Sequence, residues 1–194
     1  AGLTGLLAAI KLREAGYSFT VIEKNPEIGG TWYENTYPGV AVDTPSHFYS
    51  YSFELNPDWS HYTPNGPEFQ QYLLRIAEKY ELRQHVVFDT RVLGCTWDEA
   101  AQCWNVELRD ASGTRTERAN AVMNAHGPVN RWSWPKIPGL ESFQGAKMHT
   151  AGWDHSVSLA GKRVALIGTG ASAVQVGPAI APEVEHLTIF QRSR

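Results

Sequence analysis

The sequence is poor in cysteine and lacks long apolar runs. Cys95 and Cys103 are its two cysteines, and neither belongs to a CxxC pair or a Cys/His cluster. This excludes a disulfide framework and a zinc site, and we expect reduced thiols in a cytoplasmic protein. The seven histidines show no HExxH spacing, so no metal site is expected. Every apolar stretch ends before the ~20 residues of a membrane span, and no basic, apolar leader is visible.

The sequence also lacks an excess of charge of either sign. Its 17 Lys and Arg against 20 Asp and Glu give a formal net charge of -3, and the basic residues are scattered. This pattern argues against a nucleic-acid partner and against a membrane surface. With 42% hydrophobic residues in 194, the chain can bury a core, which excludes disorder as its main state.

The N-terminal segment carries a helix followed by a strand. Leu3, Leu6, Leu7 and Ile10 recur at helical spacing, Gly16 follows as a stop signal, and residues 18–23 form a β-rich apolar run. This is the helix and second strand of a βαβ unit whose first strand lies before residue 1, so we expect a fragment. Residues 25–66 are rich in Gly, Pro and aromatics and predict a long functional loop.

The middle of the chain predicts a helix and then a β meander. Pro67 begins a helical pattern that runs to Tyr80. Strands are expected at 86–88, 92–97, 104–108, 115–118 and 121–124, with the tightest turn at 110–113.

A second βαβ pattern follows a proline-containing linker. A strand at 162–167 leads into a glycine turn, a helix at 173–181 and another strand at 186–191. We therefore predict an α/β protein with two dinucleotide-binding, Rossmann-like folds. The expected boundaries are 1–127 for the first fold, 128–158 for the linker and 159–194 for the start of the second.

The second glycine turn predicts a dinucleotide site. Gly168-x-Gly170-x-x-Ala173 follows a strand and opens a helix, so the backbone can approach a pyrophosphate at the helix N-terminus. The expected contacts are Gly168, Thr169, Gly170, Ala171, Ser172 and Ala173. The alternative is a tight turn without a ligand.

The residues after the last strand favour NADPH as that dinucleotide. Gln191 and Arg192 stand where an NAD-specific site has an acidic residue, and a guanidinium can bind a 2′-phosphate. The alternative is a solvated arginine at a strand end.

The first unit carries half of the same glycine pattern. Gly2 and Gly5 match its second and third glycines, and Glu23 closes the following strand, where a carboxylate can accept from a ribose. Two such folds in one chain indicate two different dinucleotides.

Several motifs together resemble the flavin-dependent Baeyer–Villiger monooxygenases. In the first fold these are Gly29-Gly30-Thr31-Trp32-Tyr33, Tyr37-Pro38-Gly39, Asp43 and residues 49–53. In the linker, Phe143-x-Gly145-x-x-x-His149-Thr150-x-x-Trp153-Asp154 is similar to the family fingerprint in the variant that ends in Asp. Residues 35–47 are similar to the 4-hydroxyacetophenone monooxygenase subgroup, and Ala125-His126-Gly127-Pro128 departs from the family pattern.

The resemblance implies an enzyme that uses FAD, NADPH and O2 to insert one oxygen atom beside a ketone carbonyl, giving an ester or lactone. It implies FAD contacts from Gly30, Thr31, Trp32, Asp43 and Tyr49, although Trp32 and Tyr49 can equally be core aromatics. It also implies catalytic roles for two residues. Asp43 would orient an arginine expected after Arg194, the alternative being a solvated loop acid. His149 would couple the linker to NADPH binding, the alternative being a loop histidine packed on an indole.

Two other interpretations remain, and a third is excluded. A dithiol reductase would need a redox CxxC, which the sequence lacks. An N- or S-oxygenating flavin monooxygenase shares the folds but should end its linker motif differently. A nucleotide-binding fragment without activity is the non-enzymatic interpretation.

Overall fold

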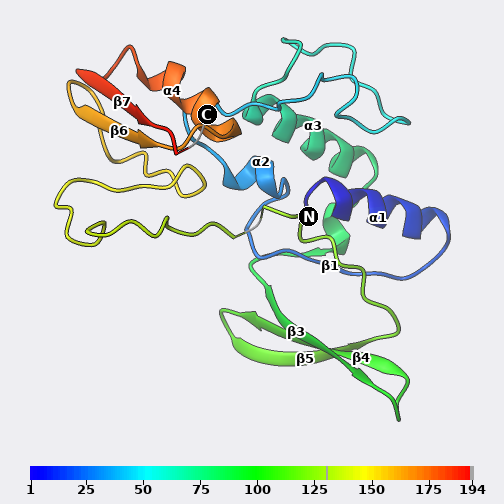
Figure 1. Cartoon of the computed structure of the whole chain (residues 1–194). Helices are drawn as coiled ribbons and strands as arrows, with labels where there is room; N and C mark the ends of the chain where they lie inside the picture. The colour runs from blue at the N-terminus through cyan, green and yellow to red at the C-terminus, as the bar shows by residue number, and fades with distance from the viewer. Residues whose placement is uncertain (130, 193–194) are drawn as a thin grey trace. The chain divides into compact units, whose positions relative to one another are not determined.

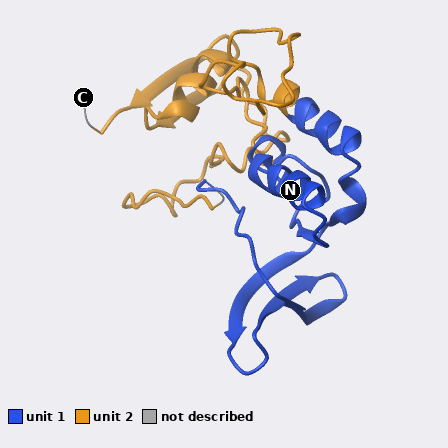
Figure 2. Ribbon diagram, turned by 90° about the vertical axis from the view of Figure 1, so that its right-hand side faces the viewer, with its two compact units in different colours: residues 1–33, 70–130 blue, residues 34–69, 131–194 orange. Residues whose placement is uncertain are grey.

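A computed structural model describes residues 1–129 and 131–192. The chain divides into two compact units (Figure 2). Unit 1 contains Ala1–Tyr33 and Gln70–Asn130, and unit 2 contains Glu34–Phe69 and Arg131–Arg194. The boundaries expected from the sequence at 127/128 and 158/159 stay a prediction.

Unit 1 begins with helix α1, Leu3–Glu14, as the spacing of its leucines predicts. Leu6, Ala9 and Ile10 are buried on one face. The helix ends in a glycine cap: Tyr17 N–H donates to Leu12 O (2.9 Å), Gly16 N–H donates to Arg13 O (3.0 Å), and Gly16 has φ +76°. Only glycine adopts this conformation without strain, so the predicted stop at Gly16 is confirmed.

A short parallel pair follows α1 in unit 1. Strand β1, Val21–Ile22, pairs with β2, Val86–Val87, in the register Val21↔Val86. The 3-10 helix η1, Arg83–His85, precedes β2, and Arg83 holds Glu27 through two hydrogen bonds of 2.6 and 3.2 Å. The Arg83 hydrogen bond lowers the pKa of Glu27, so the pair stays ionised at neutral pH.

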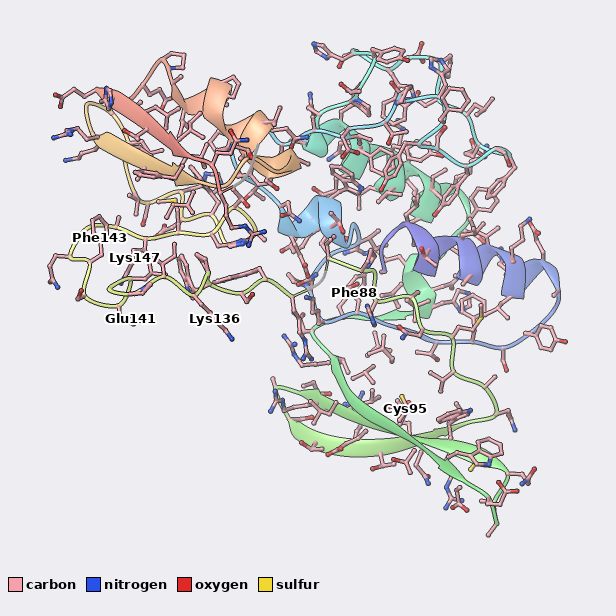
Figure 3. All side chains as sticks on the ribbon, viewed as in Figure 1. Phe88, Cys95, Lys136, Glu141, Phe143 and Lys147 are labelled. Carbon is pink, nitrogen blue, oxygen red and sulfur yellow. The ribbon has the colours of Figure 1, made fainter. Side chains whose placement is uncertain are left out.

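A three-stranded antiparallel sheet completes unit 1 (Figure 1). Its strands are β3, Arg91–Asp98, β4, Cys103–Asp110, and β5, Gly113–Ala119. The tight turn predicted at 110–113 is confirmed by the Asp110↔Gly113 pairing. Cys95 lies on β3 (Figure 3) and is exposed, Cys103 is buried, and both are free thiols.

The strand predicted at 121–124 is wrong. Residues 121–127 have no regular secondary structure, and both edges of β4 are already paired, by β3 and by β5. The segment instead runs beside α1, where a Cβ built on Gly5 would lie 3.9 Å from Ala125 Cβ. Local β propensity did not suffice, since a strand also needs a partner edge.

Two further helices lie where the long loop was predicted and after it. Helix α2, Thr31–Glu34, is one turn within the expected loop, and α3 runs Gly66–Lys79. Phe69, Tyr72, Leu73, Ile76 and Ala77 of α3 are buried, which matches the predicted helical spacing.

Unit 2 contains the second βαβ pattern. Strand β6, Arg163–Ile167, leads through the glycine turn to α4, Ala171–Ile180, and then to β7, His186–Phe190. The two strands are parallel, with Arg163 opposite His186 and Ile167 opposite Phe190. The carboxyl ends of both strands and the N-terminus of α4 therefore meet at one edge, the ligand edge of doubly wound sheets.

Residues 40–66 of unit 2 form a folded loop. Val42 N–H donates to Pro64 O (2.9 Å) and Gly66 N–H to Val40 O (2.8 Å), so residues 40–42 pair antiparallel with 64–66. Ser46 bonds to the carbonyls of His61 and Tyr62. Among the described residues, no helix is long and apolar enough to cross a membrane.

Candidate functional site

The first glycine turn lets two backbone segments of unit 1 touch. Gly2 is the extended N-cap of α1, and a Cβ on Gly30 would lie 2.8 Å from Gly2 Cα. Gly30 also has φ +55°, which disfavours a side chain for a second reason. The N-terminus of α1 therefore lies against the Gly29-Gly30 backbone, and any larger residue at position 30 would push them apart.

Glu23 lies beside this turn. Glu23 is 6% exposed, and its carboxylate accepts hydrogen bonds from the backbone nitrogens of Ala1 and Asn25, the latter at 2.9 Å. Its own backbone extends the β1–β2 pairing, because Glu23 N–H donates to Val87 O (2.9 Å). The structure thus brings Glu23 and Gly2 together at the end of β1, the position where a ribose-binding carboxylate is required.

The Gly29-Gly30 pair also starts helix α2. Trp32 N–H donates to Gly29 O and Tyr33 N–H to Gly30 O, both at 3.1 Å. Thr31 is exposed at the start of the helix, and Trp32 is half-buried. A Cβ on Gly29 would meet Tyr33 Cβ at 2.9 Å, so glycine is required here as well. Whether Trp32 faces a flavin stays a prediction.

The second glycine turn, in unit 2, is open. Gly168 has φ +108° and donates its N–H to Phe190 O (2.9 Å), which ties the turn to the end of β7. A Cβ built on Gly168 or Gly170 meets nothing within 4 Å. The N–H groups at the start of α4 can therefore face a phosphate. Thr169 and Ala171 are exposed here, and Ser172 and Ala173 half-buried.

Gln191 and Arg192 follow β7 and are both exposed. They leave the sheet at the same edge as the glycine turn, because β6 and β7 are parallel and Gly168 is bonded to Phe190. The Arg192 guanidinium is exposed to solvent, so an anion can reach it. Its binding to a 2′-phosphate stays a prediction.

Asp43 lies on the folded loop of unit 2, between two anchored residues. Val42 is held by Pro64, and Ser46 by His61 and Tyr62. The Asp43 side chain is exposed, and within the part of the chain that the structure describes its carboxylate has no hydrogen-bond or ion-pair partner. The backbone on both sides is fixed while the carboxylate stays available to a cation.

Tyr49 packs in the aromatic cluster of unit 2. Its ring lies 4.9 Å from that of Phe69, and Phe69 also stacks on Trp59 at 5.9 Å. This packing supports the core-aromatic alternative for Tyr49, and a flavin contact stays a prediction.

His149 is held between a turn and two tryptophans of the linker in unit 2. Trp132 stacks on the imidazole at 4.9 Å, and Trp134 meets it edge-on at 6.5 Å. The Nδ1 atom accepts from Ala151 N–H at 3.1 Å, which leaves the ring proton on Nε2. Burial lowers the pKa of His149, so the imidazole is neutral at pH 7 and offers Nε2–H as a donor.

Local contacts explain the residue types at the other positions of the fingerprint. A Cβ on Gly145 would lie 2.5 Å from the Phe143 ring, and one on Gly152 would lie 3.0 Å from Trp132. Phe143 and Lys147 lie on the same linker stretch in Figure 3, and Lys147 Nζ donates to Leu140 O at 3.0 Å. Asp154 accepts from Ser156 N–H and Oγ–H at 2.9 and 2.6 Å, and these bonds lower the pKa of its carboxyl.

The stack of Trp132 on His149 agrees with the alternative of a loop histidine packed on an indole. Two other contacts have no counterpart in the sequence-based expectations: His155 Nε2 lies 2.9 Å from Thr36 Oγ1, and Gln175 of α4 bonds to Tyr37 and Ala41. Of these, Gln175 left a signal in the sequence, because it is a long polar residue inside an otherwise apolar helix.

Comparison with known families places the chain among the monooxygenases. A family profile described as L-lysine 6-monooxygenase/L-ornithine 5-monooxygenase matches residues 49–194. Another, described as NAD(P)-binding Rossmann-like domain, matches residues 1–63. The first profile covers more than half of the chain, so the chain belongs to this monooxygenase family, and the α/β, Rossmann-like fold class is confirmed.

Individual similar proteins indicate the kind of monooxygenase that this chain resembles. A Baeyer-Villiger monooxygenase of Streptomyces coelicolor is 45% identical over 193 residues, 99% of this chain and 36% of that protein. An epsilon-caprolactone-bound cyclohexanone monooxygenase matches with TM-score 0.91 and 39% identity, covering 100% of this chain and 38% of that one. OTEMO in complex with FAD and NADP matches with TM-score 0.90 and 34% identity, again over 100% and 38%.

The expected resemblance to Baeyer–Villiger monooxygenases is thereby confirmed. The chain spans about a third of the length of these relatives, 36% of the Streptomyces protein. The subgroup, the site residues and their roles stay predictions.

Proposed function

We propose that this chain is part of an FAD- and NADPH-dependent monooxygenase that inserts one oxygen atom of O2 beside a ketone carbonyl. The balanced reaction is ketone + O2 + NADPH + H⁺ giving ester or lactone + NADP⁺ + H2O. The observation that carries the proposal is the pair of glycine turns, one at α1 and one at α4, in a chain whose linker holds His149 stacked on Trp132.

The first glycine turn fits FAD. Gly2 and Gly30 bring their backbones together without side chains of their own at the N-terminus of α1, and Glu23 provides a buried carboxylate beside it. Gly2 and Gly5 would face the pyrophosphate and Glu23 the ribose, with Thr31 and Trp32 near the ring system. A bound flavin supplies the redox chemistry with O2, and the protein supplies position and electrostatics.

The second glycine turn fits NADPH. The space beside Gly168 and Gly170 is open, and the cationic Arg192 is exposed at the same edge of the sheet. The turn would hold the pyrophosphate at the N-terminus of α4, and Arg192 would bind the 2′-phosphate.

Asp43 and His149 would act on different parts of the cycle. The exposed carboxylate of Asp43, fixed by its neighbours, would orient a cationic side chain beside the flavin. His149, neutral and packed on Trp132, would donate from Nε2 and fix the linker during NADPH use.

A ketone is favoured over an amine as the substrate. The matching family profile is named for L-lysine and L-ornithine monooxygenases, whereas the Streptomyces relative is named a Baeyer-Villiger monooxygenase. The linker motif from Phe143 to Trp153 has the Baeyer–Villiger pattern, which supports a ketone. A cytoplasmic location is part of the proposal, supported by the free thiols of Cys95 and Cys103.

The test uses the full-length, flavin-loaded enzyme with NADPH and three substrates: cyclohexanone, L-ornithine and a methyl sulfide. We expect NADPH oxidation coupled to lactone formation with cyclohexanone, and little coupling with the amine. Hydroxylated ornithine or sulfoxide without any lactone or ester from a panel of ketones would overturn the proposal.

A further inference from the structure

Gln175 of helix α4 bonds to the loop that carries Asp43. Both lie in unit 2, although they are far apart in sequence. Tyr37 Oη donates to Gln175 Oε1 at 2.7 Å, and Gln175 Nε2 donates to Ala41 O at 2.8 Å. Ala41 N–H donates to the same Oε1 at 3.3 Å. One side-chain amide thus binds both backbone groups of Ala41.

The pairing of the loop explains why Ala41 needs this partner. In the antiparallel pair of 40–42 with 64–66, the bonds run from Val42 to Pro64 and from Gly66 to Val40. The N–H and C=O of Ala41 point to the opposite side, toward α4, and would otherwise lack a protein partner. Unpaired backbone groups are energetically costly when they are shielded from water. The Gln175 amide pairs both groups of Ala41, as the backbone of a neighbouring strand would.

Gly39 brings the loop onto the helix backbone. It has φ +80° after Pro38, and Val40 N–H donates to Tyr37 O at 3.1 Å, the signature of a type II turn. A Cβ on Gly39 would lie 2.5 Å from Gln175 O and 3.0 Å from Ala179 Cβ. The turn therefore lies directly on α4, with no space for a side chain.

We propose that Gln175 is a positioning residue that fixes the Asp43 loop to helix α4. Helix α4 begins at the second glycine turn, and Gln175 lies in its second turn. A ligand bound at that turn restricts the motion of the helix. Through its hydrogen bonds, the Gln175 amide then restricts the motion of Ala41, and with it that of Asp43. The inference rests on the proposed function, in which NADPH binds at this turn and Asp43 orients a cation.

Hydrogen exchange of the full-length enzyme, resolved to single amides, tests the contact itself. Q175M keeps the length of the side chain and removes its donor and acceptor. We expect the Ala41 amide to exchange about tenfold faster, the factor expected for about one lost hydrogen bond, while the Val42 amide, bonded to Pro64, is unchanged. Added NADP⁺ should slow exchange at Ala41 in the parent and leave Q175M unaffected.

Two variants control this measurement. Q71M makes the same chemical change on the exposed face of α3 and should leave the Ala41 amide unaltered. Y37F removes only the hydroxyl that donates to Gln175 and should give a smaller increase in exchange, and it replaces Q175M if that variant does not fold. An unchanged Ala41 amide in Q175M, or in Y37F as its replacement, overturns the contact.

A double-mutant cycle tests the positioning role. If Gln175 acts through Asp43, Q175M lowers kcat about tenfold with little change in the KM for NADPH, and the Q175M/D43N double variant is no slower than D43N. Independent, multiplying effects on kcat would overturn the positioning role. The exchange measurements need NADP⁺ but no turnover, so they stand or fall separately from the proposed oxygenation of ketones.

Discussion

The indole of Trp132 lies parallel to the imidazole of His149, with ring centroids 4.9 Å apart and an interplanar angle of 11°. The stack covers one face of the imidazole, and the turn at Ala151–Gly152 holds its Nδ1 atom. Desolvation by this packing lowers the pKa of His149.

Removing the indole should raise that pKa. In W132A, the imidazole is exposed to water, so we expect the pKa of His149 to move up toward the ordinary histidine value of about 6.5. The measurement is an NMR titration of the His149 ring proton on carbon in the full-length enzyme. W134A, which removes an edge contact, is the matched control and should shift the pKa less. Identical titrations of W132A and the parent would contradict the account.

The same lowered pKa makes the His149 turn sensitive to acid. Below about pH 6.5 the unfolded histidine binds a proton, whereas the folded one binds it only at lower pH. The free energy of opening therefore falls as the pH drops from about 6.5 to the folded pKa. We expect exchange at the Gly152 amide, bonded to His149 O, to show this loss after correction for intrinsic rates. H149Q should flatten the pH dependence, and an equally steep profile in H149Q would assign it to other groups.

The Gly2–Gly30 contact predicts a specific loss of FAD. G30A places a Cβ 2.8 Å from Gly2 Cα and strains a backbone at φ +55°, so the α1 N-terminus must move. We expect G30A to be purified with much less bound flavin, measured by absorbance. G16A is the control, because Gly16 has a similar φ of +76° but open space around it. G16A should lose stability of about 1 kcal/mol and keep its FAD. Equal flavin content in G30A and the parent would remove Gly30 from the site.

The position of Arg192 leads us to expect a preference for NADPH over NADH. Charge-assisted hydrogen bonds to a phosphate contribute about 1.5–3 kcal/mol, or roughly tenfold or more in affinity. R192A should lower kcat/KM for NADPH by such a factor and leave kcat/KM for NADH nearly unchanged. If the ratio of the two constants stays the same, Arg192 is only a surface charge.

Asp43 and His149 should be separable by kinetics. D43A should slow anaerobic flavin reduction by NADPH and also lower the fraction of oxidised NADPH that yields ester, because it leaves a cation misplaced in both phases. H149A should act mainly on the reduction step. Stopped-flow absorbance and product analysis measure the two quantities, and parent values in both variants would refute the assignment.

Much of the fold was predictable because its signals are local. The helical spacing of Leu6 and Ile10 and the stop at Gly16 predicted α1, and the strand, glycine turn and helix of the second unit predicted β6 and α4. Each of these depends on side chains within a few residues. The glycine turns are predictable for the same reason, since their conformation restricts the residue type.

The contacts that organise the site were not predictable in this way. Gln175 and Tyr37 are 138 residues apart, and nothing local to either residue indicates the other. The false strand at 121–124 failed for a related reason, because a strand depends on a distant free edge. The position of Trp132 over His149 likewise depends on how the linker folds back on itself.

Insertion of oxygen beside the ketone carbonyl is measured most directly by the incorporation of isotope from ¹⁸O2. The full-length enzyme, loaded with FAD, is given cyclohexanone and NADPH under ¹⁸O2, and the lactone is analysed by mass spectrometry. We expect one ¹⁸O atom in the ring of the lactone and one NADPH oxidised per lactone formed. NADPH oxidation that yields only hydrogen peroxide, with no labelled ester or lactone from cyclohexanone or other ketones, would refute the proposed oxygen insertion.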